Sequence, residues 1–270
     1  GRKYYRRKEA TEMETFVCST RLCFGENALQ ALQTLGAKRA FLVTDPFFAK
    51  NGTAQHILSL LPDAETEVFD WVGGEPTLAM VAQGIDQLQK FRPDTLLALG
   101  GGSTCDLGGL AAALYHRGMG VVYLPTTLLA GVDAAIGGKT AVDLPAGKNL
   151  AGVIRQPLAV IFDENCLDTL SEEAMADGMA EAIKTGILAG EKLWELVNDP
   201  DPFYTSIMEH CAEYKAQVVA EDELDNNCRL ALNLGHTVGH AIERHSDYTV
   251  THGKAVAIGL ATMARAGAAL

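Results

Sequence analysis

Three histidines in the last third of the chain carry the clearest chemical signal. His236 and His240 stand four residues apart in NLGHTVGHAIE, and His252 follows in THGKA. On a helix, a spacing of four puts the first two imidazoles on one face, within reach of a common metal ion. Two core histidines would leave the same pattern, so both interpretations stand at this point. No Glu directly follows His236, which excludes the HExxH metalloprotease motif.

A carboxylate on a second predicted helix favours the metal site. Glu181 lies in MADGMAEAIK, and Lys184 follows one turn later on the same face. One carboxylate and two neutral imidazoles, with positions left open for water or substrate, form a suitable ligand set for catalytic Zn²⁺ or Fe²⁺. A buried cation beside such a site is unfavourable without an anionic partner, so Lys184 indicates an anionic ligand.

A glycine-rich turn provides a second candidate site. Residues 100–103 (GGGS) follow the predicted strand 95–99 and lead into a helical stretch. Without side chains, backbone N–H groups can approach a pyrophosphate, and the helix N-terminus adds partial positive charge. The spacing departs from GxGxxG, so a tight turn without a ligand is the alternative. Asp45, which ends another predicted strand, could bind a ribose hydroxyl or only cap a helix.

A polar, glycine-rich segment spans residues 131–152 and reads GVDAAIGGKTAVDLPAGKNLAG. Its glycines and charges predict a functional loop rather than a core element. Lys139 and Lys148 are candidate partners for a phosphate or carboxylate, although either could be an ordinary solvated side chain.

Composition limits the classes of function. The 22 Lys and Arg against 34 Asp and Glu give a net charge of −12, which disfavours nucleic-acid binding. The six cysteines form no CxxC pair, which argues against a disulfide framework or a thiolate zinc site. Because no long apolar run or secretion signal is present, we expect a cytoplasmic protein without membrane contact. Residues 1–12 precede the first Met and read as an extension.

The pattern of apolar runs predicts an α/β N-terminal Rossmann-like domain followed by an all-α C-terminal domain. We expect a dinucleotide-binding domain over residues 14–169 and a helical domain over 170–270, truncated where the Ala-rich segment ends at Leu270. The predicted strands are residues 40–43, 66–70, 95–99, 121–124 and 158–162. The predicted C-terminal helices are residues 174–188, 192–197, 207–220, 228–243 and 254–270.

Several ordered motifs resemble the 3-dehydroquinate synthase family, within the superfamily that includes glycerol dehydrogenase and iron-containing alcohol dehydrogenases. They are DLGGLAAALYHRG, PTTLLAGVDAAIGGKT, LPAGKNLAG, GMAEAIKTGIL, DELDNNCR, NLGHTVGHAIE and HGKAVAIG. The resemblance is strongest over residues 106–260. Before residue 106 the segments LVTDPFF, GGEPT and GGGS are closer to the alcohol-dehydrogenase branch.

The resemblance implies a dehydroquinate synthase-like fold and a homodimer. It also implies conversion of the sugar acid phosphate DAHP (3-deoxy-D-arabino-heptulosonate 7-phosphate) into 3-dehydroquinate and phosphate in the shikimate pathway. The family uses NAD and a divalent metal, most often zinc, with cobalt or iron as alternatives. A substrate hydroxyl is oxidised, phosphate is eliminated, the ketone is reduced again and an aldol addition closes the ring, so there is no net redox change.

The resemblance also implies roles for individual residues. The metal ligands are Glu181, His236 and His252, which leaves His240 as a substrate contact. The NAD contacts are Asp45, Glu75, Gly101, Gly102, Ser103, Asp106, Thr126, Thr127, Lys148 and Thr169. The substrate pocket is formed by Asp133, Lys139, Asn149, Lys184, Lys215, Arg229, Asn233 and His240, with Arg117 reaching the phosphate in a neighbouring subunit.

Departures from the family pattern keep other functions open. Leu78 stands where a Lys is common, Lys254 where Glu is frequent, and Asp225 where a longer acid lies near Arg229. Without substrate, we expect Glu181 and Asp225 to neutralise Lys184 and Arg229 in part. The alternatives are an NAD-dependent glycerol or alcohol dehydrogenase, a sister sugar-phosphate cyclase, and a catalytically inactive truncated NAD-binding module.

Overall fold

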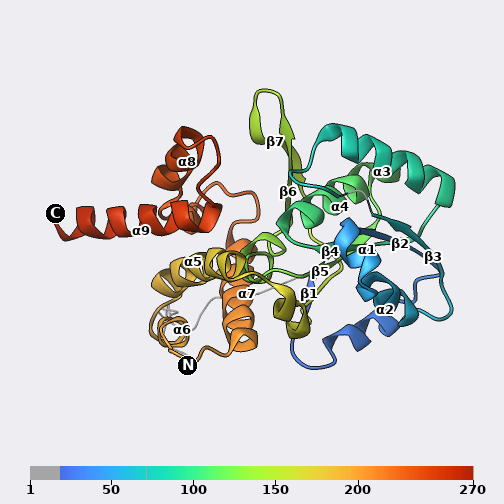
Figure 1. The fold of residues 1–270 in the computed structure, drawn as a ribbon, viewed down its shortest axis with the longest axis horizontal. Coiled ribbons are helices and arrows are strands. Elements are labelled where there is room, and N and C mark those ends of the chain that lie inside the picture. The colour runs from blue at the N-terminus through green and yellow to red at the C-terminus, as the bar shows by residue number, and fades with distance from the viewer. Residues whose placement is uncertain (1–18, 71, 270) are drawn as a thin grey trace, which may run out of the picture.

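A computed structural model describes residues 19–70 and 72–269 of the chain (Figure 1). Residues 1–12, which the sequence suggests are an extension, lie outside the described residues, as do Cys18 and Leu270. A parallel sheet with its flanking helices forms one side of the molecule, and a group of helices forms the other. No helix in the described ranges is long and apolar enough to cross a membrane.

The six-stranded sheet has the order β1-β8-β5-β4-β2-β3, and all its pairs are parallel. All five predicted strands are present, and no end is shifted by more than one residue. The sixth, β1, has three residues and was missed because so short a run shows no period. The strands are β1 (Arg21–Cys23), β2 (Arg39–Thr44), β3 (Glu65–Phe69), β4 (Thr95–Gly100), β5 (Gly120–Pro125) and β8 (Ala159–Ile161).

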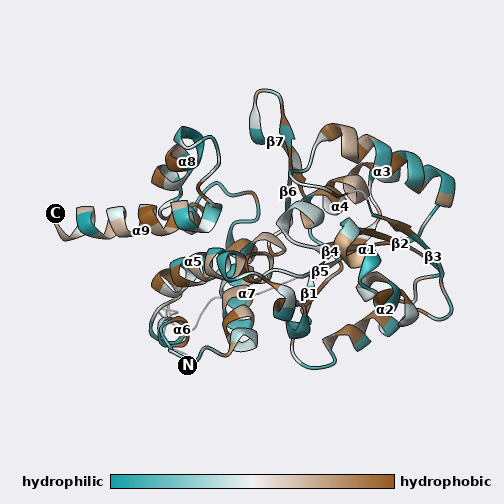
Figure 2. Ribbon diagram, viewed as in Figure 1, coloured by the Kyte–Doolittle hydropathy of each residue, from teal (hydrophilic) through white to brown (hydrophobic). Residues whose placement is uncertain are grey.

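Helices cover both faces of this sheet, which explains why its central strands are almost wholly apolar (Figure 2). Alternate residues point to opposite faces: Phe41 and Leu96 join one core cluster, and Leu42 and Leu97 join the other. The helices of this part are η1 (Ala28–Thr34), α1 (Pro46–Lys50), α2 (Thr53–Ser59), α3 (Leu78–Phe91), α4 (Gly102–Leu114) and the short η2 (Tyr115–Arg117).

The segment 131–152 is not the loop that its composition predicts. It begins in a π-helical turn, η3 (Ala130–Ala134), and continues into an antiparallel hairpin of β6 (Lys139–Leu144) and β7 (Gly147–Ile154). Gly152 permits the pairing, because a Cβ there would overlap the carbonyl oxygen of Thr140. Glycines that suggested flexibility therefore allow two strands to lie close together.

The remaining elements are helical. They are η4 (Glu164–Thr169), α5 (Glu172–Ala189), α6 (Glu191–Val197), α7 (Tyr204–Glu221), η5 (Cys228–Asn233), α8 (His236–His245) and α9 (His252–Ala268). Ser171 caps α5 as predicted, because its Oγ accepts a hydrogen bond from the backbone N–H of Ala174 at 3.2 Å. The architecture of a parallel sheet followed by helices confirms the predicted fold class, whereas the domain boundary at residues 169/170 stays a prediction.

One helix prediction is wrong. Residues 228–243 form not a single helix but η5 and α8, separated at Leu234 and Gly235. Gly235 has a φ of 80°, a left-handed conformation that ends one helix and starts the next. A Cβ at this position would lie 2.9 Å from the backbone nitrogen of Leu260 in α9. The break therefore lets α8 pack closely against α9 and places His236 in the first turn of α8.

Replacing Gly235 with Ala should destabilise the protein, because the new side chain meets both an unfavourable φ and the backbone of α9. The left-handed conformation alone costs about 1–2 kcal/mol for a residue with a Cβ. Gly84→Ala in α3 is the matched control: its Cβ would meet only Phe69, at 3.9 Å, and should stabilise the helix by about 0.5–1 kcal/mol. Urea denaturation measures both changes, and equal stability of the two variants would contradict the interpretation.

Candidate functional site

The glycine-rich turn forms one wall of a cavity of about 370 Å³ at the carboxyl ends of β2, β4 and β5. This edge is where open parallel sheets bind ligands. Five candidate dinucleotide contacts line the cavity together: Asp45, Gly101, Gly102, Ser103 and Thr127. Asp45 also caps α1 by accepting hydrogen bonds from the N–H groups of Phe47 and Phe48, so its two sequence interpretations are compatible.

Close packing explains the glycines in the turn. A Cβ on Gly100 would overlap Thr104, one on Gly101 would lie 3.2 Å from Thr127, and one on Gly102 would lie 3.3 Å from Ala134. The backbone of the first turn of α4 therefore packs directly against its neighbours. Because the glycines carry no side chains, nothing at these positions separates the backbone N–H groups from the cavity. A cavity beside a bare helix N-terminus suits the pyrophosphate of NAD.

The other candidate dinucleotide contacts lie around this centre. Thr126 is buried at the end of β5 and donates its N–H to the carbonyl of Gly100 at 2.9 Å. Lys148 on the hairpin forms an ion pair with Glu75 and lies 4.2 Å from the ring centroid of Tyr248. Thr169, at the end of η4, is not among the residues that line the cavity.

Asp106 lies on α4 and is not among the residues that line the cavity. Burial raises the pKa of its carboxyl group to about 7, although a hydrogen bond from the backbone N–H of Ala141 and the charge of Lys215 act in the opposite direction. A carboxyl group that ionises near neutral pH can exchange a proton with a hydroxyl group or with water.

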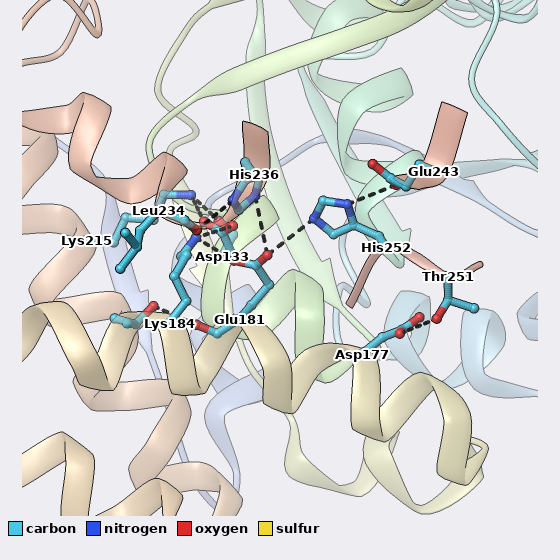
Figure 3. A network of polar contacts seen from close by, with 11 residues as sticks. Asp133, Asp177, Glu181, Lys184, Lys215, Leu234, His236, Glu243, Thr251 and His252 are labelled. Carbon is cyan, nitrogen blue, oxygen red and sulfur yellow. Dashed lines mark hydrogen bonds and ion pairs between the residues drawn. The ribbon is translucent and has the colours of Figure 1, made fainter. Parts of the chain in front are cut away.

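A carboxylate and two imidazoles from three helices meet beside the middle of α5 (Figure 3). The Nε2 atoms of His236 in α8 and His252 in α9 lie 3.4 Å and 3.3 Å from the same oxygen, Oε1, of Glu181 in α5. Their three ligand atoms lie within 4.8 Å of one another. The structure therefore brings together the three residues that the resemblance selects as metal ligands.

The chemistry of this group fits a divalent cation. Glu181 is fully buried, and neither of its two carboxylate oxygens has a hydrogen-bond partner among the described residues, although Lys184 forms an ion pair with the carboxylate. Burial lowers the pKa of His236, which favours the neutral, ligating form. At His252 burial also acts to lower the pKa, but Glu181 and Glu243 outweigh it and raise the pKa to about 9. The site thus attracts positive charge.

Two lysines extend the site towards the sheet. Lys184 on α5 lies 3.5 Å from Asp133, and Lys215 on α7 forms an ion pair with the same carboxylate and donates to its backbone carbonyl at 2.7 Å. Burial opposes ionisation of Asp133, but the two ammonium groups hold its pKa well below the usual range. Lys184 is therefore neutralised by Glu181, as expected, and also by Asp133.

Arg229 is buried and donates from its guanidinium to the carbonyls of Glu223 and Gly137, at 2.7 Å and 2.8 Å. The charge of Asp225 acts on Arg229, as expected for a partial neutralising partner, and the same carboxylate also forms an ion pair with Lys139 of the hairpin. The carboxylate of Asp222, which sequence reasoning missed, accepts hydrogen bonds from the N–H groups of Asn226, Asn227 and Arg229. It thereby fixes the turn that carries Arg229.

Four candidate residues lie on the surface or at the edge of this group. His240 is exposed on α8, with its ring centroid 5.4 Å from that of His236, which confirms the predicted common face. Asn233 is exposed at the end of η5, and Asn149 is exposed on β7. Arg117 is exposed in a turn where its φ is 65°. Among these four, His240 is the one with neighbouring side chains at the metal group, those of His236 and His252.

Two further acidic residues adjoin the metal group and were not predicted. Glu243 on α8 lies 3.1 Å from Nδ1 of His252. Asp177 on α5 lines the cavity and accepts a hydrogen bond from Thr251 at 2.6 Å. The position of Asp177, one turn before Glu181 on the same helix, was a usable signal. The pairing of Glu243 with His252 depends on the α8–α9 packing and had no signal in the sequence.

Comparisons with known proteins match nearly three quarters of the chain to one family. Residues 75–177 match the model described as 3-dehydroquinate synthase N-terminal, and residues 178–270 match the C-terminal model. The 3-dehydroquinate synthase of Streptococcus mutans serotype c is 44% identical over 214 residues, which cover 74% of this chain and 60% of that enzyme. The chain thus spans about 60% of the length of this relative.

Two solved structures share the fold. A 2-deoxy-scyllo-inosose synthase complexed with carbaglucose-6-phosphate, NAD⁺ and Co²⁺ has a TM-score of 0.80 at 25% identity, covering 88% of this chain and 70% of that chain. A 2-epi-5-epi-valiolone synthase from Streptomyces hygroscopicus with NAD⁺ and Zn²⁺ bound has a TM-score of 0.75 at 25% identity, covering 94% and 75%.

Asp106→Asn should change how stability depends on pH. Because the folded-state pKa of about 7 lies above the ordinary value of 3.8, the folded protein binds this proton more tightly than the unfolded chain. The stability it contributes is therefore complete below about pH 4 and is lost as the pH rises to about 7. Asn cannot ionise, so the variant should gain up to ~4 kcal/mol relative to the parent between pH 4 and pH 8.

Chemical denaturation at several pH values measures this gain. Asp86→Asn, an exposed position on α3, is the matched control and should show no such trend. A parallel pH dependence of Asp106→Asn and the parent protein would refute the assignment.

Proposed function

The chain belongs to the 3-dehydroquinate synthase family, and we propose that it converts DAHP into 3-dehydroquinate and inorganic phosphate. The observation that carries this proposal is the arrangement along α5. Asp177 faces the glycine-lined cavity, Glu181 faces two imidazoles, and Lys184 faces Asp133. Spacings of four and three residues put all three on one side of the helix, so a dinucleotide, a metal ion and an anionic substrate could meet there.

NAD and a divalent metal are the cofactors we propose. Bound NAD would take a hydride from the carbon that bears a substrate hydroxyl, as that hydroxyl loses its proton, and would later return the hydride; the metal would polarise the oxygen on that carbon. Glu181, His236 and His252 would hold the metal. The cavity residues Asp45, Gly101, Gly102, Ser103 and Thr127 would hold NAD, with Glu75, Asp106, Thr126, Lys148 and Thr169 at its periphery.

The buried cations support an anionic substrate. Lys184 and Lys215 balance the charges of Glu181 and Asp133, so a divalent ion would leave these four residues and the metal with a net charge of +2. A substrate that carries a carboxylate and a phosphate would offset this excess. Arg229, Lys139, Asn149, Asn233 and His240 complete the proposed pocket.

This charge arrangement also favours the cyclase over a net oxidoreductase. Glycerol and simple alcohols are uncharged and would leave the excess positive charge uncompensated. The sister cyclases named above act within the same fold, but the family models that match this chain are those of 3-dehydroquinate synthase.

Zinc is the metal that we propose, with cobalt or iron as substitutes, because nitrogen and oxygen ligands bind all three. The two structural neighbours hold Co²⁺ and Zn²⁺. We further propose a cytoplasmic homodimer in which Arg117 reaches the phosphate bound by the neighbouring subunit. The exposure of Arg117 in its turn supports this role.

Incubation of the protein with DAHP, NAD and Zn²⁺ tests the proposed reaction. We expect phosphate and 3-dehydroquinate to form in equal amounts, without a lasting rise in absorbance at about 340 nm, because the hydride returns to the same substrate molecule. Steady NADH formation with glycerol or a simple alcohol, and no response to DAHP, would support the dehydrogenase instead.

His252→Ala should weaken metal binding by at least ~100-fold, because it removes one of three protein ligands and even outer-shell changes cost 10–100-fold. His245→Ala, an exposed histidine at the end of α8, is the matched control and should bind metal normally. Elemental analysis after dialysis measures the metal content. Full occupancy in His252→Ala would exclude the proposed ligand set.

A further inference from the structure

Both imidazoles of the metal group use their ring nitrogens in the same way. Each Nε2 faces Oε1 of Glu181, while each Nδ1 faces an oxygen on the opposite side of the ring. For His236 this oxygen is the backbone carbonyl of Leu234, at 3.3 Å. For His252 it is the carboxylate of Glu243, at 3.1 Å (Figure 3).

A neutral imidazole carries one N–H and one lone pair. A carboxylate or carbonyl accepts only from the N–H, so an oxygen beside Nδ1 selects the tautomer whose Nε2 lone pair is free for a metal. We propose that Glu243 is a positioning residue that fixes the tautomer and the ring orientation of His252. This inference rests on the metal centre of the proposed function and concerns a residue outside its ligand set.

The two imidazoles differ in how strongly packing restricts the rotation of their rings. The side chain of His236 is 11% exposed, so packing restricts its ring, whereas that of His252 is 34% exposed. A partly solvated ring can rotate between its rotamers at little cost. The hydrogen bond to Glu243 supplies the restraint that packing does not provide at His252.

The backbone of His252 is held independently of its ring. Thr251 donates a hydrogen bond to Asp177 of α5, and Gly253 packs so closely on Asp177 that a Cβ would overlap that residue. These contacts fix the start of α9 against α5 and thus the distance between His252 and Glu181. They leave the rotation of the imidazole undetermined.

Glu243 is itself well anchored. Its backbone carbonyl accepts hydrogen bonds from the N–H of Tyr248, at 2.8 Å, and from the hydroxyl of Ser246, at 3.0 Å. These bonds stabilise the turn between α8 and α9. Its side chain is 14% exposed, so the carboxylate is partly desolvated, which strengthens its hydrogen bond to His252.

A second geometric possibility involves the same carboxylate. Ligand atoms of His240, Glu243 and His252 also lie within 4.8 Å of one another. A metal bound there by Nδ1 of His252 would displace the hydrogen bond that positions the ring. The positioning role predicts a single metal ion per chain, whereas a separate site predicts two.

Titration of the metal-free protein with Co²⁺ tests the proposal without reference to catalysis. Visible absorption reports the coordination geometry, and competition with a chelator gives the affinity. We expect Glu243→Leu to bind Co²⁺ ~10–100-fold more weakly than the parent protein. Glu243→Gln should fall between the two, because Gln keeps an acceptor oxygen but loses the charge.

Glu173→Gln is the matched control, because it makes the same change in a carboxylate whose ion-pair partner is Lys254 on α9. It should retain the parent affinity. Thermal unfolding of the metal-free variants separates positioning from stability: all should melt within a few degrees of the parent.

An unchanged Co²⁺ affinity and spectrum in Glu243→Leu would overturn the proposal, as would two ions per chain in the parent and one in the variant. A loss of affinity fully explained by unfolding of Glu243→Leu, with normal binding in Glu243→Gln, would also overturn it. Failure of the proposed function would appear differently: the parent protein would bind Co²⁺ but would not convert DAHP.

Discussion

A carboxylate without access to water, that of Glu181, is the constraint on which the helical part of the structure depends. Removing an ionised carboxylate from water costs several kcal/mol unless nearby positive charge or a metal compensates. The compensation comes from different elements: Lys184 on the same helix, His236 at the start of α8 and His252 at the start of α9. The packing of α8 and α9 against α5 is therefore linked to the electrostatics of one buried group.

Helix α5 connects the two halves of the site. Its Asp177 reaches the glycine-lined cavity and also holds Thr251, the residue before His252. Its Gly178 packs against the backbone of Leu129, where a Cβ would lie 2.6 Å from the amide nitrogen. A single rigid helix thus sets the position of the metal group relative to the dinucleotide cavity, which hydride transfer between bound groups requires.

Local patterns were sufficient to predict five of the six strands of the parallel sheet and most helices. Apolar runs located β2 to β5 and β8, and Ser171 marked the start of α5, because hydrophobic burial and capping are properties of short segments. Local patterns failed where the conformation depends on distant residues. Gly235 reads as a helical residue until the approach of Leu260 is known, and the glycines at 131–152 read as a loop until the pairing of β6 with β7 is known.

The sequence by itself determined the fold class, the family resemblance, and the identities of five residues at the glycine-lined cavity and of the two histidines that face Glu181. Those features follow from residue type and from motifs whose spacing is local. Only the tertiary structure decided that Asp225 pairs with Lys139, that Asp222 holds the turn of Arg229, and that Glu243 contacts His252. Each of these contacts depends on the course of a loop or on the packing of two helices. The periodicity of the sequence predicts elements but not the distances between them.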